Sequence, residues 1–139
     1  MALAPLVLAV DDEPGIRLLL KLDLAEQGFR VVTAAGASEA LAEMDANRPD
    51  LILLDVVMPG MTGFELLEAI RARWDTPAIF LSAKDRDADR REGLAHGADD
   101  YVLKPFNSDD LGERIRAVLE RAQPAEPEET LPEDGPTST

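Results

Sequence analysis

Short apolar runs alternate with longer segments of helical period along most of this chain, and this alternation restricts the fold more than any other feature. The runs are expected to be strands, at residues 5–10, 29–33, 51–54, 78–81 and, more weakly, 100–103. The segments after them are expected to be helices, at residues 15–27, 38–47, 64–73, 86–96 and 109–121. Strands that are apolar throughout need cover on both faces. Five strand–helix repeats therefore predict an α/β fold, with a parallel sheet between two layers of helices.

The composition changes near the C-terminal end of the sequence. The segment QPAEPEETLPEDGPTST, which begins at Gln123, contains prolines and acids but no basic residue. Such a segment cannot bury enough apolar surface to fold. We therefore expect one domain over residues 1–122 and a disordered tail or linker over residues 123–139. Ser108 is expected to cap the last helix of the domain.

The charge of the chain limits its partners. With a net charge of −14, it is not expected to bind nucleic acid directly or to bind an anionic membrane. No apolar run approaches the ~20 residues of a membrane-spanning helix, and the apolar N-terminus lacks the basic residues of a signal peptide. The chain has no cysteine, which fits the reducing cytoplasm. A cytoplasmic protein that meets cations or basic surfaces is predicted.

Polar side chains stand directly after four of the apolar runs. The residues that follow the first, third, fourth and fifth runs are, in order, Asp11 with Asp12, Asp55, Ser82 and Lys104. Sites in open parallel sheets lie beyond the carboxyl ends of the strands. If the first and third strands are neighbours, the three aspartates converge. Carboxylates that close together repel one another unless a cation lies among them.

Mg²⁺ suits such a cluster, because it prefers oxygen ligands. A carboxylate nucleophile, a metal ion, the amine of Lys104 and the hydroxyl of Ser82 are also the parts needed to accept a phosphoryl group. Each group alone has a plainer interpretation: acids and Ser82 can cap helices, and Lys104 can be a solvated lysine. Their occurrence at the ends of different strands favours one common site.

Four segments together resemble the receiver domain of two-component response regulators: VDDEP, LLDVVMPGMTGFE, LSAKD and GADDYVLKPF. The resemblance covers residues 5–122. It implies a flavodoxin-like (βα)5 sheet with strand order 2-1-3-4-5. It also implies a phosphorylation-dependent signalling switch that is not an enzyme, although it catalyses its own phosphotransfer and dephosphorylation. The implied phosphodonor is a histidine kinase or a phosphotransfer protein.

The resemblance also assigns roles at the site. It implies that Asp55 is the phosphoacceptor and that Asp12 and Asp55 bind Mg²⁺. Asp11 would act mainly through water, and the main-chain carbonyl of Val57 would be a further ligand. The remaining two site residues would contact the phosphoryl group, Ser82 by a hydrogen bond and Lys104 by its charge.

A switch is implied on the face formed by the fourth helix, the fifth strand and the fifth helix. Phosphorylation would draw in Ser82, Tyr101 would rotate inward, and this face would be remodelled. The Lys104–Pro105 bond is expected to be cis. Val57 offers no polar side chain to orient an attacking water, so slow hydrolysis of the acyl phosphate is expected.

The segment GADDYVLKPFNSDDL further resembles receivers of the winged-helix transcription-factor class, whose active forms dimerise through this face. A phosphorylation-promoted homodimer is thereby implied. Its ion pairs would be Arg90–Asp110, Asp100–Arg114 and Asp99–Arg116. Arg91 and Glu113 depart from the pattern, because apolar residues are expected at these two positions in the centre of the contact.

The first helix suggests a second surface. Its expected buried face is formed by Ile16, Leu19, Leu20 and Leu24. Leu18 and Leu22 lie on the other side and are expected to be exposed. In the receiver family the kinase docks near this helix, so the resemblance implies a docking patch at these two leucines. Singly exposed leucines are also common without a function.

Three other interpretations use parts of the same pattern. A flavodoxin would need a loop rich in Ser, Thr and Gly where DDEPG stands. A phosphatase of the haloacid-dehalogenase type, with an aspartyl nucleophile, would need a second acid where Val57 stands. A degenerate receiver that acts only as a binding module would lack a site residue, and the sequence lacks none.

Overall fold

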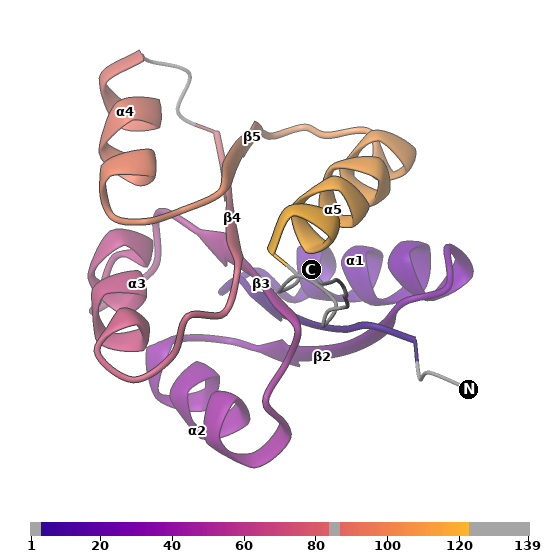
Figure 1. Ribbon diagram of the computed structural model, residues 1–139, viewed down its shortest axis with the longest axis horizontal. Coiled ribbons are helices and arrows are strands. Elements are labelled where there is room, and N and C mark those ends of the chain that lie inside the picture. The colour runs from indigo at the N-terminus through magenta and orange to yellow at the C-terminus, as the bar shows by residue number, and fades with distance from the viewer. Residues whose placement is uncertain (1–3, 84–86, 123–139) are drawn as a thin grey trace, which may run out of the picture.

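The computed structural model describes residues 4–83 and 87–122, in which strands and helices alternate strictly (Figure 1). The strands are β1 Leu6–Val10, β2 Arg30–Ala34, β3 Leu51–Asp55, β4 Ala78–Ser82 and β5 Asp100–Leu103. The helices are α1 Pro14–Glu26, α2 Ala37–Asn47, α3 Gly63–Arg71, α4 Asp87–Ala95 and α5 Ser108–Ala122. Every predicted element is present, with ends within two residues of those expected.

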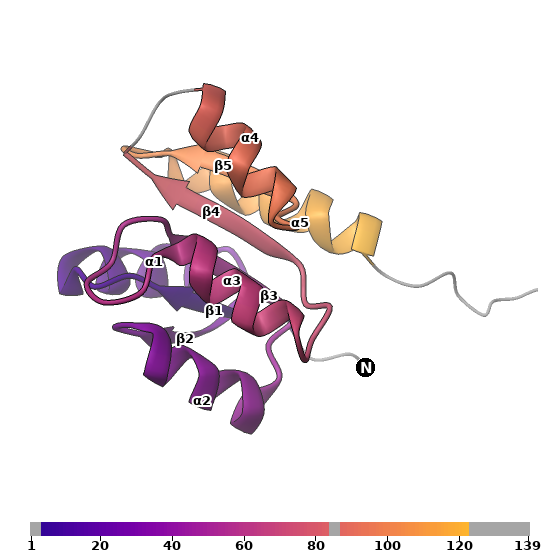
Figure 2. The same ribbon diagram turned by 90° about the vertical axis from the view of Figure 1, so that its left-hand side faces the viewer.

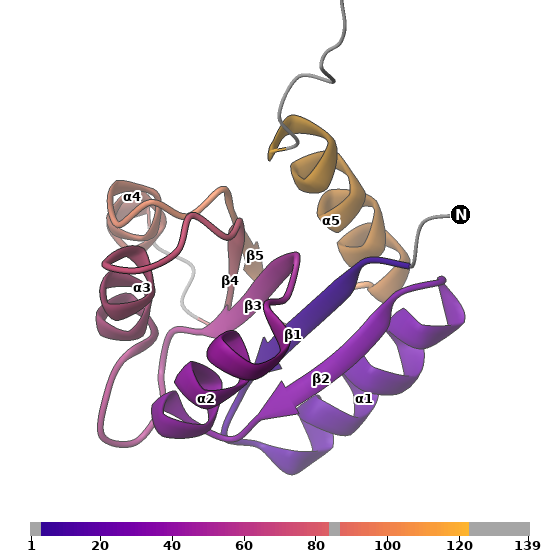
Figure 3. The same cartoon turned by 60° about the horizontal axis from the view of Figure 1, so that its bottom comes forward.

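All strand pairs are parallel, and the sheet has the order β2-β1-β3-β4-β5, which confirms the predicted fold. Helices α1 and α5 cover one face of the sheet, and α2, α3 and α4 cover the other (Figures 2 and 3). Strands β1, β3 and β4 are buried at every residue, because successive side chains enter opposite cores. Leu51 and Leu53 pack toward α1 and α5, whereas Ile52 and Leu54 pack toward α2 and α3.

Helix α3 begins at Gly63 because Thr62 and Glu65 form a capping box. The Thr62 hydroxyl accepts a hydrogen bond from the backbone of Glu65 at 3.1 Å, and the Glu65 carboxylate accepts one from the backbone of Thr62 at 2.9 Å. The capping box therefore determines where α3 begins after the loop that follows β3. Of the described residues, none belongs to a helix long and apolar enough to cross a membrane.

The junction of α1 and α5 corrects one expectation. Ser108 does not cap α5; the side chain of Asn107 does, by accepting a hydrogen bond from the backbone of Asp110 at 3.0 Å. The Ser108 hydroxyl instead donates to Asp23 at 2.5 Å, and its carbonyl accepts a hydrogen bond from Gln27 at 2.9 Å. These contacts tie the start of α5 to α1. The predicted tail, residues 123–139, lies outside the described residues.

Candidate functional site

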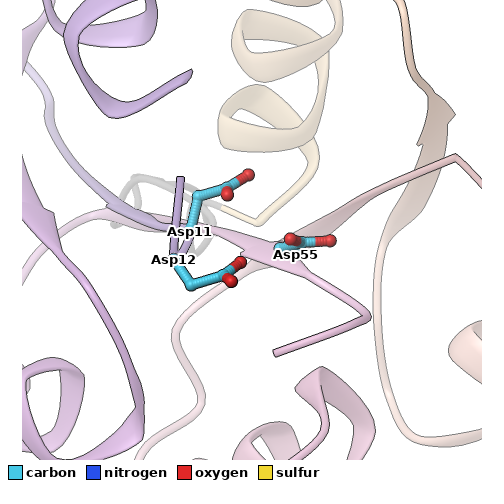
Figure 4. Close-up of side chains that lie close together, drawn as sticks. All are labelled: Asp11, Asp12 and Asp55. Carbon is cyan, nitrogen blue, oxygen red and sulfur yellow. The ribbon is translucent and has the colours of Figure 1, made fainter. Parts of the chain in front are cut away.

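Three carboxylates meet at the carboxyl edge of the sheet. Asp11 and Asp12 follow β1, Asp55 ends β3, and these strands are hydrogen-bonded neighbours. One carboxylate oxygen from each lies within 4.8 Å of the others (Figure 4). Asp11 and Asp55 are buried, with 1% and 6% of their surface exposed, whereas Asp12 is exposed. The sheet therefore brings together the cluster that the sequence predicts.

Lys104 approaches this cluster from the end of β5. Its Nζ lies 2.8 Å from Asp11 Oδ2, 3.4 Å from Asp55 Oδ2 and 3.9 Å from Glu13 Oε1. Burial alone would lower the pKa of Lys104, but its hydrogen bond to Asp11 and the charges of Asp55 and Asp11 outweigh burial and raise that pKa. The side chain is therefore a fixed cation. The Lys104–Pro105 bond is cis, as expected.

Asp11 is held through every polar atom it has. Its N–H donates to Ala34 at 3.1 Å, and its carbonyl accepts from the Arg17 guanidinium at 2.7 Å. One carboxylate oxygen accepts from the Glu13 N–H at 2.9 Å and the other from Lys104 at 2.8 Å. Asp11 is thus a fully satisfied group in the wall of the site.

Asp55 is held much less closely. It accepts a hydrogen bond from the Val57 N–H at 3.3 Å and lies 3.4 Å from Lys104. Burial and then the charge of Asp11 raise the pKa of its carboxyl to about 6, against the lowering effects of Lys104 and Val57. Such a carboxylate is stabilised by any further cation that enters.

The backbone around Asp55 is nevertheless tight. The N–H of Gly63 donates to the carbonyl of Val56 at 2.8 Å, and a Cβ at Gly63 would lie 2.3 Å from the carbonyl oxygen of Asp55. Only glycine lets the start of α3 lie against the end of β3 in this way. No pattern in the sequence singles out Gly63, because the close approach depends on how α3 returns to the sheet.

A surface pocket opens above the carboxylates. It is lined by Asp12, Glu13, Asp55, Val57, Ala83 and Lys104. Ser82 ends β4 at the same edge; it is fully buried, and its carbonyl accepts a hydrogen bond from the Lys104 N–H at 2.7 Å. A phosphoryl-sized anion entering this pocket would meet Asp55 and Lys104 together.

Tyr101, the predicted switch residue, is already buried, with 2% of its surface exposed. Its ring centroid lies 6.3 Å from that of Phe80. The Arg90 guanidinium lies 5.5 Å from the Tyr101 ring centroid and donates to the Tyr101 carbonyl at 3.2 Å. A Cβ at Gly93 of α4 would lie 3.1 Å from the same ring. Helix α4 therefore packs directly on Tyr101.

The other residues predicted for a dimer have partners within the chain. Arg114 bonds Asp100 at 2.9 Å and Asp110 at 3.1 Å. Asp99 accepts a hydrogen bond from the backbone at the start of β4, and Arg116 donates to the backbone at the end of α1. A dimer through the α4–β5–α5 face would have to exchange some of these contacts for contacts between chains.

The leucines predicted to be exposed on α1 are exposed, Leu18 by 57% and Leu22 by 58%. Leu20 and Leu24 are buried, as expected, but Leu19 is 41% exposed, so its assignment to the buried face was wrong. Three consecutive leucines give the period little power to choose between neighbouring positions.

The chain has relatives among known proteins. A family model described as the response regulator receiver domain matches residues 7–116. The transcriptional regulatory protein YvrH of Bacillus subtilis is 49% identical over 116 residues, which are 83% of this chain and 49% of that protein. The transcriptional regulatory protein AfsQ1 of Streptomyces coelicolor is 46% identical over 119 residues, which are 86% of this chain and 53% of that protein. The chain therefore spans about half the length of these curated relatives.

Solved structures agree with this relationship. The receiver domain of the Francisella response regulator 1452 is 37% identical, with a TM-score of 0.81 over 86% of this chain and 99% of that chain. The chemotaxis protein CheY4 of Vibrio cholerae is 40% identical, with a TM-score of 0.79 over 84% of this chain and 99% of that chain.

Proposed function

The chain belongs to the response regulator receiver domain family, and we propose that Asp55 is the phosphoacceptor of this signalling switch. The observation that carries the proposal is the state of the Asp55 carboxylate. It is buried, it has only long contacts, and it faces the pocket beside Lys104. Asp11 has no such freedom, because each of its polar atoms is already bonded.

The carboxylate cluster fits Mg²⁺. Three carboxylate oxygens within 4.8 Å of one another are hard ligands for a small divalent cation. Asp12 and Asp55 would hold the ion directly, Asp11 would act mainly through water, and the main-chain carbonyl of Val57 would be a further ligand. Bound Mg²⁺ supplies positive charge that offsets the charge on phosphoryl oxygens.

Three side chains then take part in phosphoryl transfer. An oxygen of Asp55 attacks the phosphorus atom as the bond to the donor breaks, and an acyl phosphate forms. Lys104, which is already 3.4 Å from Asp55, pairs with the transferred group. Ser82 donates its hydroxyl proton to a phosphoryl oxygen. Self-catalysed hydrolysis completes the cycle, and it is slow because Val57 cannot orient a water.

The signal passes from Ser82 to the face formed by α4, β5 and α5. Movement of Ser82 toward the phosphoryl group favours the buried position of Tyr101, on which α4 packs through Gly93. Phosphorylation thus stabilises one arrangement of α4. The same face forms a homodimer in the phosphorylated state, with Arg90, Arg114 and Arg116 facing Asp110, Asp100 and Asp99 of a second copy.

The phosphodonor is a histidine kinase or a phosphotransfer protein that docks at Leu18 and Leu22, in the cytoplasm. Relatives of the chain are transcriptional regulatory proteins. The receiver domain, residues 1–122, and the acidic tail or linker, residues 123–139, make no direct contact with nucleic acid or a membrane. A transcriptional response would depend on other domains or partners.

The test is incubation with acetyl phosphate and Mg²⁺, followed by intact mass measurement. The wild-type chain is expected to gain one phosphoryl group, and Asp55→Asn is expected to gain none. Asp109→Asn, which changes an exposed acid of α5, is the matched control and should gain the group normally. A wild-type chain that stays unmodified, or an Asp55→Asn chain that is modified equally well, would overturn the proposal.

A further inference from the structure

The turn between β1 and α1 carries three successive acids, and α1 begins there without a side-chain cap. Glu13 occupies the N-cap position of α1, but its side chain makes no capping hydrogen bond. The next residue, Pro14, has no N–H to offer. The turn must nevertheless hold two of the proposed metal ligands in place.

Arg17 fastens both ends of this turn. Its backbone N–H donates to the carbonyl of Glu13 at 3.1 Å, as the first hydrogen bond of α1. Its guanidinium Nη1 reaches back and donates to the carbonyl of Asp11 at 2.7 Å. One residue therefore holds the main chain on each side of Asp12.

Asp12 depends on this support. Among residues 4–83 and 87–122, its carboxylate has no hydrogen bond and no ion pair, and it is exposed. Its position is set by the backbone between Asp11 and Glu13, and both of these residues are bonded to Arg17. A residue that steadies the backbone here steadies the carboxylate.

The two cations near the site act in different ways. Lys104 contacts the carboxylates themselves, so its charge competes with an incoming metal ion. Arg17 has no carboxylate partner within the part of the chain that the structure describes, and its guanidinium binds a main-chain carbonyl. It can therefore order the turn and leave the carboxylate oxygens available.

We infer that Arg17 is a positioning residue for the metal site, acting on Asp11 and Asp12 through the backbone of the β1–α1 turn. The inference rests on the proposed function, because it takes these carboxylates as ligands of Mg²⁺. Mg²⁺ demands nearly ideal octahedral geometry, whereas Ca²⁺ tolerates irregular coordination. Loosening the turn should therefore weaken Mg²⁺ binding more than Ca²⁺ binding.

The experiment is calorimetric titration of the unphosphorylated chain with Mg²⁺ and, separately, with Ca²⁺. Arg17→Met is expected to weaken Mg²⁺ binding about tenfold or more, the range for residues that orient metal ligands, and Ca²⁺ binding clearly less. Arg17→Lys, which keeps a cation but not the fork of donors, should fall between. Arg30→Met is the matched control, since Arg30 also donates to a backbone carbonyl, that of Ala4, away from the site.

The change in the ratio of the two affinities separates positioning from general destabilisation, which would weaken both ions alike. Equal weakening of both, or unchanged Mg²⁺ binding in Arg17→Met, overturns the inference. If Arg17→Met is unfolded, the ratio of Mg²⁺ to Ca²⁺ affinity in Arg17→Lys tests the inference in its place. A wild-type chain that binds no Mg²⁺ overturns this inference and the proposed metal site together. Phosphorylation that persists in Asp55→Asn overturns only the assignment of Asp55.

Discussion

Two carboxylates stand side by side in this site and are held in opposite ways. Asp11 is bonded through all its polar atoms, at distances of 2.7 to 3.1 Å. Asp55 is also buried, but its contacts measure 3.3 and 3.4 Å, and burial raises the pKa of its carboxyl to about 6. Asp11 is part of the framework, whereas the Asp55 carboxylate has only the two longer contacts. The difference gives each a separate role, although the residue type is the same.

The same substitution at the two positions should change stability in opposite directions, and this is the largest effect that we expect. Without metal at pH 7, Asp55→Asn should raise the free energy of unfolding by roughly 1–3 kcal/mol, since each pKa unit above the ordinary value costs ~1.4 kcal/mol. Asp11→Asn should lower it by roughly 1–3 kcal/mol, because an amide N–H₂ would face Lys104 and leave that cation poorly paired. Urea unfolding followed by Trp74 fluorescence measures both.

The pH dependence of the free energy of unfolding is the control for these two substitutions. Between about pH 4 and 6 the folded chain holds a proton on Asp55 that the unfolded chain has released. The contribution of Asp55 to the free energy of unfolding should therefore fall as pH rises through this window, and the gain from Asp55→Asn should be complete above pH 6 and vanish near pH 4. Two substitutions that destabilise equally at pH 7 would contradict the comparison.

The side chain of Asp55 has long contacts, but its backbone is tightly packed against Gly63. Glycine substitutions test the packing of the backbone. Gly63→Ala places a Cβ 2.3 Å from the Asp55 carbonyl oxygen, so it should destabilise by roughly 1–3 kcal/mol, as overpacking does. Gly15→Ala, in the first turn of α1, meets nothing within 4 Å. It should be neutral or stabilise by up to about 1 kcal/mol. Thermal unfolding of the two variants checks this, and equal effects would contradict it.

The sequence predicts which acids gather at the site but not how each is held. Apolar runs identify the strands, and the carboxyl edge of a parallel sheet then collects Asp11, Asp12 and Asp55. Glu13 and Arg17 hold Asp11 from nearby in the sequence, but the hydrogen bond to its second carboxylate oxygen comes from Lys104, 93 residues away. No local pattern encodes a contact of that kind. Asp55 is held less closely because Nζ of Lys104 lies 2.8 Å from Asp11 Oδ2 but 3.4 Å from Asp55 Oδ2.

Long-range contacts also explain the expectations that failed. Ser108 has the side chain of a helix cap, but Asp23, 85 residues away, takes its hydroxyl, and Asn107 becomes the cap. Asp23 lies near the apolar stripe of α1 because it has this partner, which the helical period could not reveal. Leu19 is exposed although its spacing is that of a buried residue. Periodicity gives the face of a helix and leaves its edges undetermined.

A smaller effect concerns the metal. Because Asp55 takes up a proton with a pKa of about 6, protons should compete with Mg²⁺ there. From pH 7 to pH 5 the apparent affinity for Mg²⁺ should fall about tenfold, which corresponds to ~1.4 kcal/mol. Calorimetric titration at several pH values measures it. In Asp55→Asn the remaining affinity should depend less on pH in this range, and an equal pH dependence in both chains would contradict the assignment.

The smallest effect is expected where a cation bridges two acids away from the site. Arg114 forms ion pairs with Asp100 and Asp110. Lys104 does the same with Asp11 and Asp55. The Arg114 side chain is 42% exposed, whereas that of Lys104 is 14% exposed. Water solvates the acids that Arg114→Met leaves behind, so this variant should lose about 0–1 kcal/mol in urea unfolding.

Lys104→Met should change stability more than Arg114→Met, because it leaves two buried carboxylates without their cation. A loss above about 2 kcal/mol for Arg114→Met would show that burial does not decide the strength of these bridges. A value this small would bear on the proposed homodimer. Contacts that contribute so little within one chain can be exchanged for contacts with a second copy at little cost, whereas the contacts of Lys104 cannot. The ion pairs on the α4–β5–α5 face are therefore expected to open more readily than those of Lys104 at the carboxylate site.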